Sequence, residues 1–175
     1  MSQSYLLYLQ DHTLGARILL RSSLETIALL IHLNQLIEEV LNGTLNFHKF
    51  SDKTSLLLLG SRNKTTKHSS INVVTILEKC NQQYDNISSI YADLSECAHP
   101  NFEGTCFGYS TPNTDSHTTE FSNKWVQMYS EVHLKSMLLF MEVFEHEYNE
   151  VWIKRIRELE GWVEANDASL EASKS

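Results

Sequence analysis

The feature that most constrains this chain is its scarcity of residues that break helices. Its 175 residues include only six glycines and two prolines, too few for the many tight turns of a β-sandwich or a barrel. Between these breakers, apolar residues recur at intervals of three and four, which is the period of one helix face. The sequence therefore predicts an all-α protein, and its 42 % hydrophobic residues are enough for a sizeable core.

The periodic segments predict a bundle of about five helices in which the first and the last are long. The expected helices cover residues 5–41, 52–59, 71–83, 86–98 and 119–163. The first has a possible interruption near Thr13–Gly15 and a stop signal at Asn42-Gly43. We expect a single helical domain over residues 1–166 and a frayed C-terminal tail over residues 167–175.

The length of the two end helices bears on the oligomeric state. A helix of about forty residues is about 60 Å long, which is more than a globule of this size needs to cover its own core. We therefore expect a homodimer in which the long helices share apolar surface. An elongated monomer is the alternative.

Charge is unevenly distributed along the chain. The net charge of −8 gives no support to a general role in coating nucleic acids. Residues 49–68 hold five lysines and arginines against one acid, whereas residues 142–171 hold nine acids against three basic residues. A polyanion would have to meet the first segment and a basic protein the second. Both segments are equally read as ordinary solvated surface.

The cysteines and the apolar runs indicate the compartment. Three cysteines, Cys80, Cys97 and Cys106, lack a repeating spacing, and no basic segment followed by an apolar stretch opens the sequence. We expect a cytoplasmic protein with reduced thiols. The apolar runs are far shorter than the eighteen or so residues of a membrane span, so no membrane association is expected. Neither a metal site nor a cofactor is predicted, because no ligand spacing and no Gly-rich phosphate loop occur.

Four polar residues lie near one stripe of the first expected helix: Arg17, Arg21, Glu25 and His32. The surrounding sequence is apolar, and unpaired charge in such a setting is costly. The stripe therefore predicts either a network of structural ion pairs or a polar pocket for a ligand or for catalysis.

A second polar constellation closes the helix expected over residues 86–98. His99 stands next to Pro100, which stops the helix, and opens a stretch that contains Asn101 and Gly104. A histidine at such a position can act as a general acid or base. The alternative is a structural histidine that bonds loop carbonyl groups. The following residues 101–118 are expected to form a long loop, and loops of this length are often functional.

Two motifs in these segments resemble a family of uncharacterised bacterial helical proteins. They are Arg21-Ser-Ser-Leu-Glu25 and Leu94-Ser95-Glu-Cys-Ala-His99-Pro100-Asn101-Phe-Glu-Gly104. More distantly, the order of helices resembles the HEPN (higher eukaryotes and prokaryotes nucleotide-binding) superfamily. Many of its members are metal-independent ribonucleases of toxin–antitoxin and phage-defence systems. Those members carry an arginine followed after four to six residues by a histidine, a pattern that Arg62 and His68 match.

The resemblance implies an effector directed at RNA or a nucleotide. In that hypothesis Arg21, Glu25 and His99 are the catalytic residues, and the histidine supplies acid–base assistance while arginine stabilises charge on the phosphate. Arg17, Asn101, Arg62 and His68 would contribute to binding.

The competing hypothesis is a noncatalytic dimeric module for interaction or regulation. Here the same residues fix loop geometry, and the acidic last helix meets a basic partner protein. Whether the chain is an enzyme is left open by the sequence.

Overall fold

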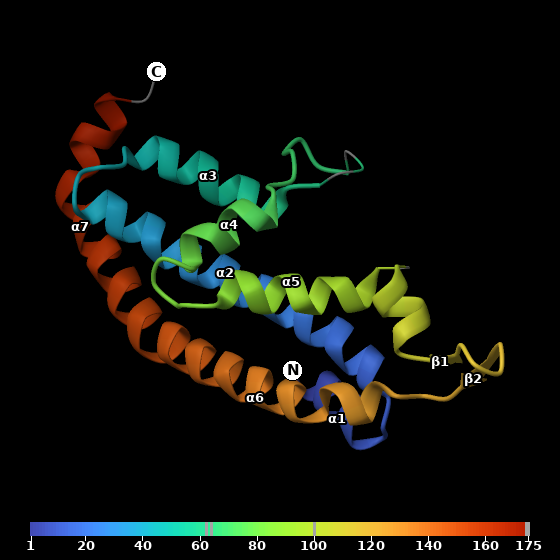
Figure 1. Ribbon diagram of the computed structural model, residues 1–175. Helices are drawn as coiled ribbons and strands as arrows, with labels where there is room; N and C mark the ends of the chain where they lie inside the picture. The colour runs from blue at the N-terminus through green and yellow to red at the C-terminus, as the bar shows by residue number, and fades with distance from the viewer. Residues whose placement is uncertain (62, 64, 100, 174–175) are drawn as a thin grey trace. The chain divides into compact units, whose positions relative to one another are not determined.

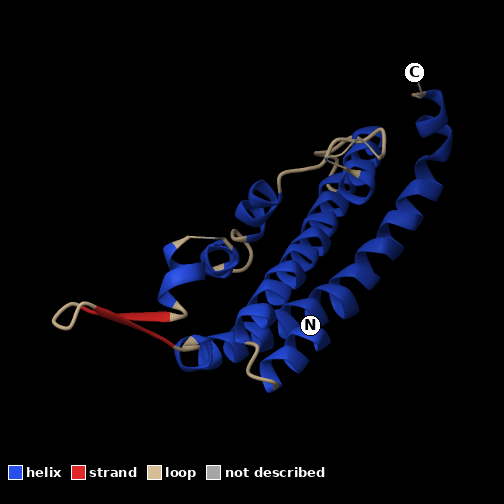
Figure 2. Ribbon diagram, turned by 90° about the vertical axis from the view of Figure 1, so that its right-hand side faces the viewer, coloured by secondary structure: helices blue, strands red, loops and turns tan. Residues whose placement is uncertain are grey.

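The computed structural model describes residues 1–61, 63, 65–99 and 101–173. Of these residues 73 % are helical, and a single two-strand sheet is the only other regular structure among them (Figures 1 and 2). The prediction of a mostly helical protein is therefore confirmed. None of the helices in the described part of the chain is long and apolar enough to cross a membrane.

The N-terminal helical region divides into a short and a long helix, α1 (Ser2–Leu9) and α2 (Thr13–Leu41). The first helix is therefore short, and the long helix that we expected to be the first is the second, α2. Between them the backbone amides of residues 10–12 donate to the carbonyl groups of Leu7 and Tyr8, and Asp11 adopts a φ of 60°, which breaks the helical path. The stop at Asn42-Gly43 is confirmed, because α2 ends at Leu41 and Gly43 takes a φ of 73°.

Three helices follow: α3 (Phe47–Leu59), α4 (Val73–Cys80) and α5 (Ile87–Ala98). Helix α3 starts five residues before its expected position because the Asn46 side chain accepts hydrogen bonds from the amides of His48 and Lys49. Helix α4 is shorter than predicted, and Asn72 caps it.

Residues 102–121 are more ordered than the long loop that the sequence predicts. They form a single π-helical turn, η1 (Phe102–Phe107), and a hairpin of β1 (Ser110–Asn113) and β2 (Thr118–Phe121). The strands are antiparallel, with Ser110 opposite Phe121. The turn between them is held by the Asn113 side chain, which accepts from the amides of Asp115 and Ser116.

The last helical region is divided by a second π-helical turn. It comprises α6 (Trp125–His146), η2 (Glu147–Trp152) and α7 (Ile153–Ala172). Residues 167–172, expected to be a frayed tail, continue α7. Their Ala, Leu and Glu residues have high helix propensity, and the Asn166 side chain donates to the carbonyl of Trp162.

The chain divides into two compact units. The first unit comprises Met1–Thr26 with Tyr84–Glu142, and the second comprises Ile27–Gln83 with Val143–Ser175. Helices α2 and α6 each contribute residues to both units.

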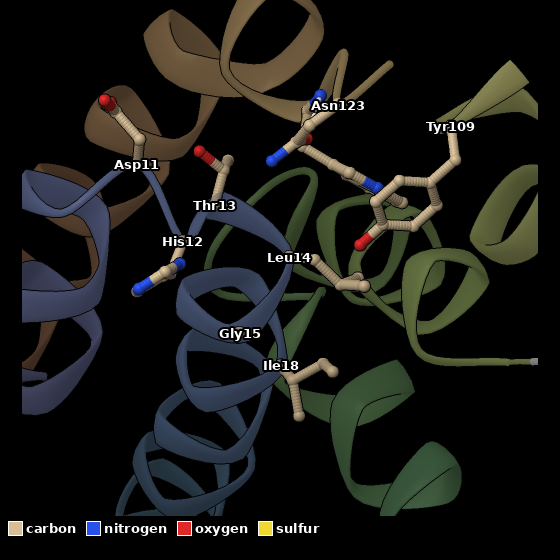
Figure 3. Close-up of a pocket in the computed structure, with 9 residues that line it drawn as sticks. Asp11, His12, Thr13, Leu14, Gly15, Ile18, Tyr109 and Asn123 are labelled. Atoms are coloured by element: carbon tan, nitrogen blue, oxygen red, sulfur yellow. Dashed lines mark hydrogen bonds between the residues drawn. The ribbon is translucent and has the colours of Figure 1, made fainter. Parts of the chain in front are cut away.

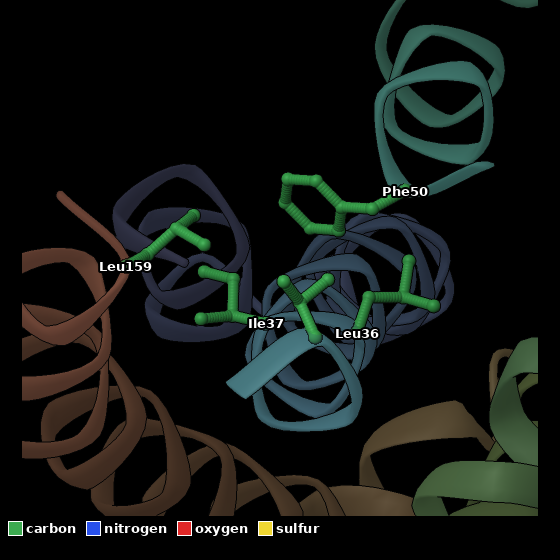
Figure 4. Close-up of a cluster of buried hydrophobic side chains, with 5 residues drawn as sticks. Leu36, Ile37, Phe50 and Leu159 are labelled. Atoms are coloured by element: carbon green, nitrogen blue, oxygen red, sulfur yellow. The ribbon is translucent and has the colours of Figure 1, made fainter. Parts of the chain in front are cut away.

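Each unit has its own buried apolar side chains. Those of the first include Ala16, Leu20, Leu24, Ile87, Leu94, Trp125 and Phe140. The core of the second consists of Leu36, Ile37, Val40, Phe50 and Leu159. Figure 4 shows Leu159 of α7 and Ile37 of α2 pointing toward one another. Burial of each such side chain stabilises the fold by about 1.5–3 kcal/mol.

Candidate functional site

A cluster of polar side chains joins α2 to α5 in the first unit. The Arg21 Nη2 donates to the Tyr91 hydroxyl (2.6 Å) and lies 3.1 Å from Glu25 Oε1, while Arg21 Nε donates to Ser95 Oγ (2.9 Å). The Tyr91 hydroxyl in turn donates to Glu25 Oε1 (2.9 Å). We call these four residues, Arg21, Glu25, Tyr91 and Ser95, the Arg21 cluster. It brings together two of the three predicted catalytic residues.

Arg17, one helical turn before Arg21, is fully buried. Its Nη2 donates to Asp93 Oδ2 (2.5 Å) and its Nε to Cys97 Sγ (3.1 Å), and its guanidinium lies 4.2 Å from the centre of the Tyr129 ring. Burial lowers the pKa of Arg17, but the hydrogen bonds to Cys97 and Asp93 outweigh it and raise that pKa. The side chain is therefore a permanent buried cation that is paired with α5.

These pairings explain the spacing of charges on α2. Residues 17, 21 and 25 contact successively earlier parts of α5, so the N-terminal part of α2 runs antiparallel to α5. Arg17 and Arg21 each donate two hydrogen bonds to α5. For Arg17 these contacts favour a structural role over a role in a ligand pocket.

A buried histidine on α6 was not singled out by the sequence. His133 Nε2 lies 3.3 Å from Ser4 Oγ, which donates to the carbonyl of Ala16 (2.7 Å), and the Tyr8 ring stacks on the imidazole at 5.4 Å. Burial, and secondarily the positive charge of Arg17, lower the pKa of His133 to about 4. The imidazole is therefore neutral at physiological pH. Only its position between apolar residues of α6 signals that it is buried.

Asn101 caps the π-helical turn η1, to which Gly104 belongs. The Asn101 side-chain oxygen accepts from the Gly104 amide (2.8 Å), and its nitrogen donates to Glu96. A β-carbon on residue 104 would lie 2.2 Å from the His99 carbonyl oxygen, so only glycine fits there. Asn101, predicted to bind a ligand, thus holds this turn.

The position of His99 leaves its predicted role untested. His99 caps the C-terminus of α5 one helical turn beyond Ser95. Its side chain is exposed and makes no hydrogen bond to any described residue. Its participation in one site with Arg21 and Glu25 stays a prediction.

The remaining predicted residues belong to other parts of the chain. Arg62 lies outside the described residues. His68 belongs to the second unit, and its carbonyl accepts from the Ser61 amide (2.9 Å). His32 is buried in the second unit, where burial, and secondarily the charge of Lys79, lower its pKa.

The second unit contains a buried carboxylate that the sequence did not reveal. Glu147, at the start of η2, accepts from Asn34 Nδ2 (2.6 Å) and from Gln83 Nε2 (2.7 Å). Burial, and secondarily the Glu147 carboxylate, raise the pKa of the nearby Cys80 to about 12. Both carboxylate oxygens of Glu147 are hydrogen-bonded, which satisfies a buried charge and favours a structural role.

Metal binding has no geometric basis in the part of the chain that the structure describes. No group of three or more His, Cys, Asp or Glu side chains gathers there in a way that could hold an ion. Cys97 bonds to Arg17 and Cys106 is exposed.

Comparison with known proteins adds no relative to these observations. No protein-family model, no curated protein and no solved structure matches this chain. The evidence on function is therefore the arrangement of its own side chains.

Proposed function

We propose that this chain is a noncatalytic helical module that associates with a second copy of itself through exposed apolar side chains. The observation that carries the proposal is the number of large apolar side chains that α1 and α6 expose in the first unit. Large apolar side chains are exposed there at Tyr5, Leu6, Leu9, Val132, Leu138 and Met141. Leu6, Leu9 and Leu138 are each more than half exposed.

Exposed apolar residues in this number support an interface. Single apolar residues on a surface are ordinary, but several on neighbouring helices mark sites of association. The two helices are neighbours, because the Tyr8 hydroxyl of α1 lies 3.1 Å from Ser130 Oγ of α6. Burying such side chains at an interface provides the principal favourable free energy of dimerisation.

The chemistry of the Arg21 cluster also supports a noncatalytic role. A carboxylate beside an arginine compensates its charge and weakens its attraction for phosphate. The Arg21 guanidinium lies beside the Glu25 carboxylate and uses Nε and Nη2 for two hydroxyl groups of α5. Its bonds hold α2 to α5.

The test is the molar mass of the purified chain by light scattering at micromolar concentration. We expect twice the monomer mass of 20.1 kDa, and we expect Leu138→Glu to weaken dimerisation at least tenfold, because it places a charge in a desolvated interface. Gln127→Glu, at an exposed polar position of α6, is the matched control and should leave the mass unchanged. A monomer at these concentrations would contradict the proposal.

A second candidate function is an RNA- or nucleotide-directed effector of the HEPN type, in a defence or toxin–antitoxin context. The observation that favours it is exposure: the Arg21 and Glu25 side chains each remain about 30 % exposed, so a phosphate group has access to the Arg21 cluster. In this function Arg21 would stabilise phosphate charge and His99 would transfer a proton.

This candidate is tested by incubating the purified protein with total RNA and with tRNA in the presence of a chelator. Cleavage that persists in chelator and is lost in His99→Ala would support the effector. Intact RNA would leave the interaction module as the better proposal, and the light-scattering result is independent of this outcome.

A further inference from the structure

A pocket of about 260 Å³ lies in the first unit where α2 begins. Its walls come from the α1–α2 turn, the first turns of α2, Tyr109 after η1, and the residues that lead into α6 (Figure 3). Leu14, Ile18 and Tyr109 provide apolar walls. The pocket is slightly smaller than most ligand pockets, which have about 300–1000 Å³, so it suits only a small ligand, and it has one apolar side.

The polar side of the pocket is rich in hydrogen-bond donors. Within the described residues, the amides of Thr13, Leu14 and Gly15 donate to no acceptor, and the first intrahelical bond is made by Ala16 to the His12 carbonyl. These amides carry the partial positive charge at the N-terminus of a helix of 29 residues. Such a terminus favours an anion.

Asn123 supplies a further donor. Its side-chain oxygen accepts from the Trp125 amide (3.1 Å) and so caps α6, which leaves its side-chain nitrogen as a donor. Figure 3 shows the Asn123 side chain directed toward Thr13, whose hydroxyl oxygen lies on the side of Asp11, while the Asp11 carboxylate points away from Asn123.

Two buried polar atoms at this pocket lack partners. Thr13 and Trp125 both line it, each is only 1 % exposed, and neither Thr13 Oγ1 nor Trp125 Nε1 has a hydrogen-bond partner among the described residues. An unsatisfied buried polar group destabilises the fold, because it has lost its hydrogen bonds to water. Native proteins rarely retain such groups without a functional or structural reason.

We propose that this pocket binds a small organic anion. Its phosphate or carboxylate group would accept from the α2 amides, the Thr13 hydroxyl and the Asn123 side-chain nitrogen, and its apolar body would contact Leu14, Ile18 and Tyr109. The site is separate from the Arg21 cluster and does not depend on either candidate function.

The test is a titration of the 15N-labelled full chain, followed by the amide resonances of residues 13–15. Three probes are used: inorganic phosphate, phenyl phosphate and benzoate. Both aromatic anions should shift these amides at millimolar concentration or below and bind at least several-fold more tightly than inorganic phosphate. The stronger of the two identifies the anionic group.

Two variants test the assigned donors. Thr13→Val removes the hydroxyl at nearly constant volume and should weaken binding about tenfold. Asn123→Asp keeps an oxygen that caps α6 but replaces the donor by a negative charge, and should abolish binding. Thr26→Val, on the exposed surface of α2, is the matched control and should bind like the unaltered chain.

Circular dichroism confirms that each variant is folded before titration. The proposal is overturned if residues 13–15 do not respond to either aromatic anion, or if Asn123→Asp binds as tightly as the unaltered chain. It is also overturned if the probes shift resonances only elsewhere.

Discussion

The carbonyl oxygen of His99 occupies the space in which a side chain on residue 104 would begin, 2.2 Å from the ideal β-carbon position of Gly104. This contact explains the glycine at position 104, and the hydrogen bond from the Gly104 amide to the Asn101 side chain explains the asparagine at position 101. Asn101 and Gly104 therefore have a structural role where η1 begins after α5.

The first prediction is that Gly104→Ala destabilises the protein by about 2–3 kcal/mol, because the added methyl group meets backbone and displaces it. Gly161→Ala is the matched control. Gly161 lies within α7 and a β-carbon there meets nothing within 4 Å, so alanine should stabilise the helix by up to about 1 kcal/mol. Urea unfolding of both variants measures the difference. Equal effects of the two substitutions would refute the assigned role of the His99 carbonyl.

The second prediction concerns coupling within the Arg21 cluster. Arg21→Ala and Tyr91→Phe should be non-additive by about 0.5–3 kcal/mol in unfolding free energy, because their side chains share a 2.6 Å hydrogen bond. A parallel cycle with Arg21→Ala and His99→Ala asks whether His99 belongs to the same network. Additive effects there would remove His99 from the site, whereas additivity of Arg21 with Tyr91 would contradict the structure itself.

The third prediction is a loss of stability on acidification that is due to His133. Its pKa is about 4 in the folded chain and about 6.5 when unfolded. Between these values the unfolded state binds the extra proton, so unfolding becomes easier as the pH falls through this window. The full loss is about 3 kcal/mol. Unfolding curves at pH 7 and pH 4.5 for the unaltered chain and His133→Gln isolate this contribution, and an equal pH dependence in both would show that His133 does not cause it.

The fourth prediction is an order of reactivity among the thiols. Cys106 is exposed, whereas Cys80 is buried and its pKa is raised to about 12. Because the thiolate is the reactive form, Cys80 should react about 1000-fold more slowly than an ordinary thiol at pH 8. Cys97 is also buried, and burial raises its pKa despite the hydrogen bond from Arg17. Mass spectrometry after brief alkylation should find Cys106 modified first, and early modification of Cys80 would argue against its burial.

Helical periodicity was sufficient to predict the helices but not their ends. We expected the break in the first helix near Thr13–Gly15, but the structure has it at residues 10–12. There Asp11 adopts a positive φ, and no glycine or proline at these positions marks the break in the sequence. The hairpin of residues 110–121 was missed because its strands are short and mostly exposed, so they show no alternation of apolar and polar residues.

The sequence predicted only the part of the candidate site that lies on a single helix. The spacing of Arg17, Arg21 and Glu25 identified a polar stripe on α2, but the partners come from α5, about seventy residues later in the chain. The sequence does not show that Arg17 and Arg21 pair with Asp93, Tyr91 and Ser95, because the pairing depends on how α2 packs against α5. Glu147 was missed for the same reason, since Asn34 and Gln83 reach it from distant segments of the second unit.

The division of the chain into two interleaved units has a consequence for biosynthesis. Each unit combines an early segment with a late one: Met1–Thr26 waits for Tyr84–Glu142, and Ile27–Gln83 waits for Val143–Ser175. During translation neither unit has its complete set of contacts until the second of its segments has left the ribosome, and the contacts that join the two segments are distant in sequence. Leu36, Ile37 and Phe50 therefore remain without Leu159, their partner in the core, until α7 has been synthesised, and the nascent protein exposes that apolar surface in the meantime.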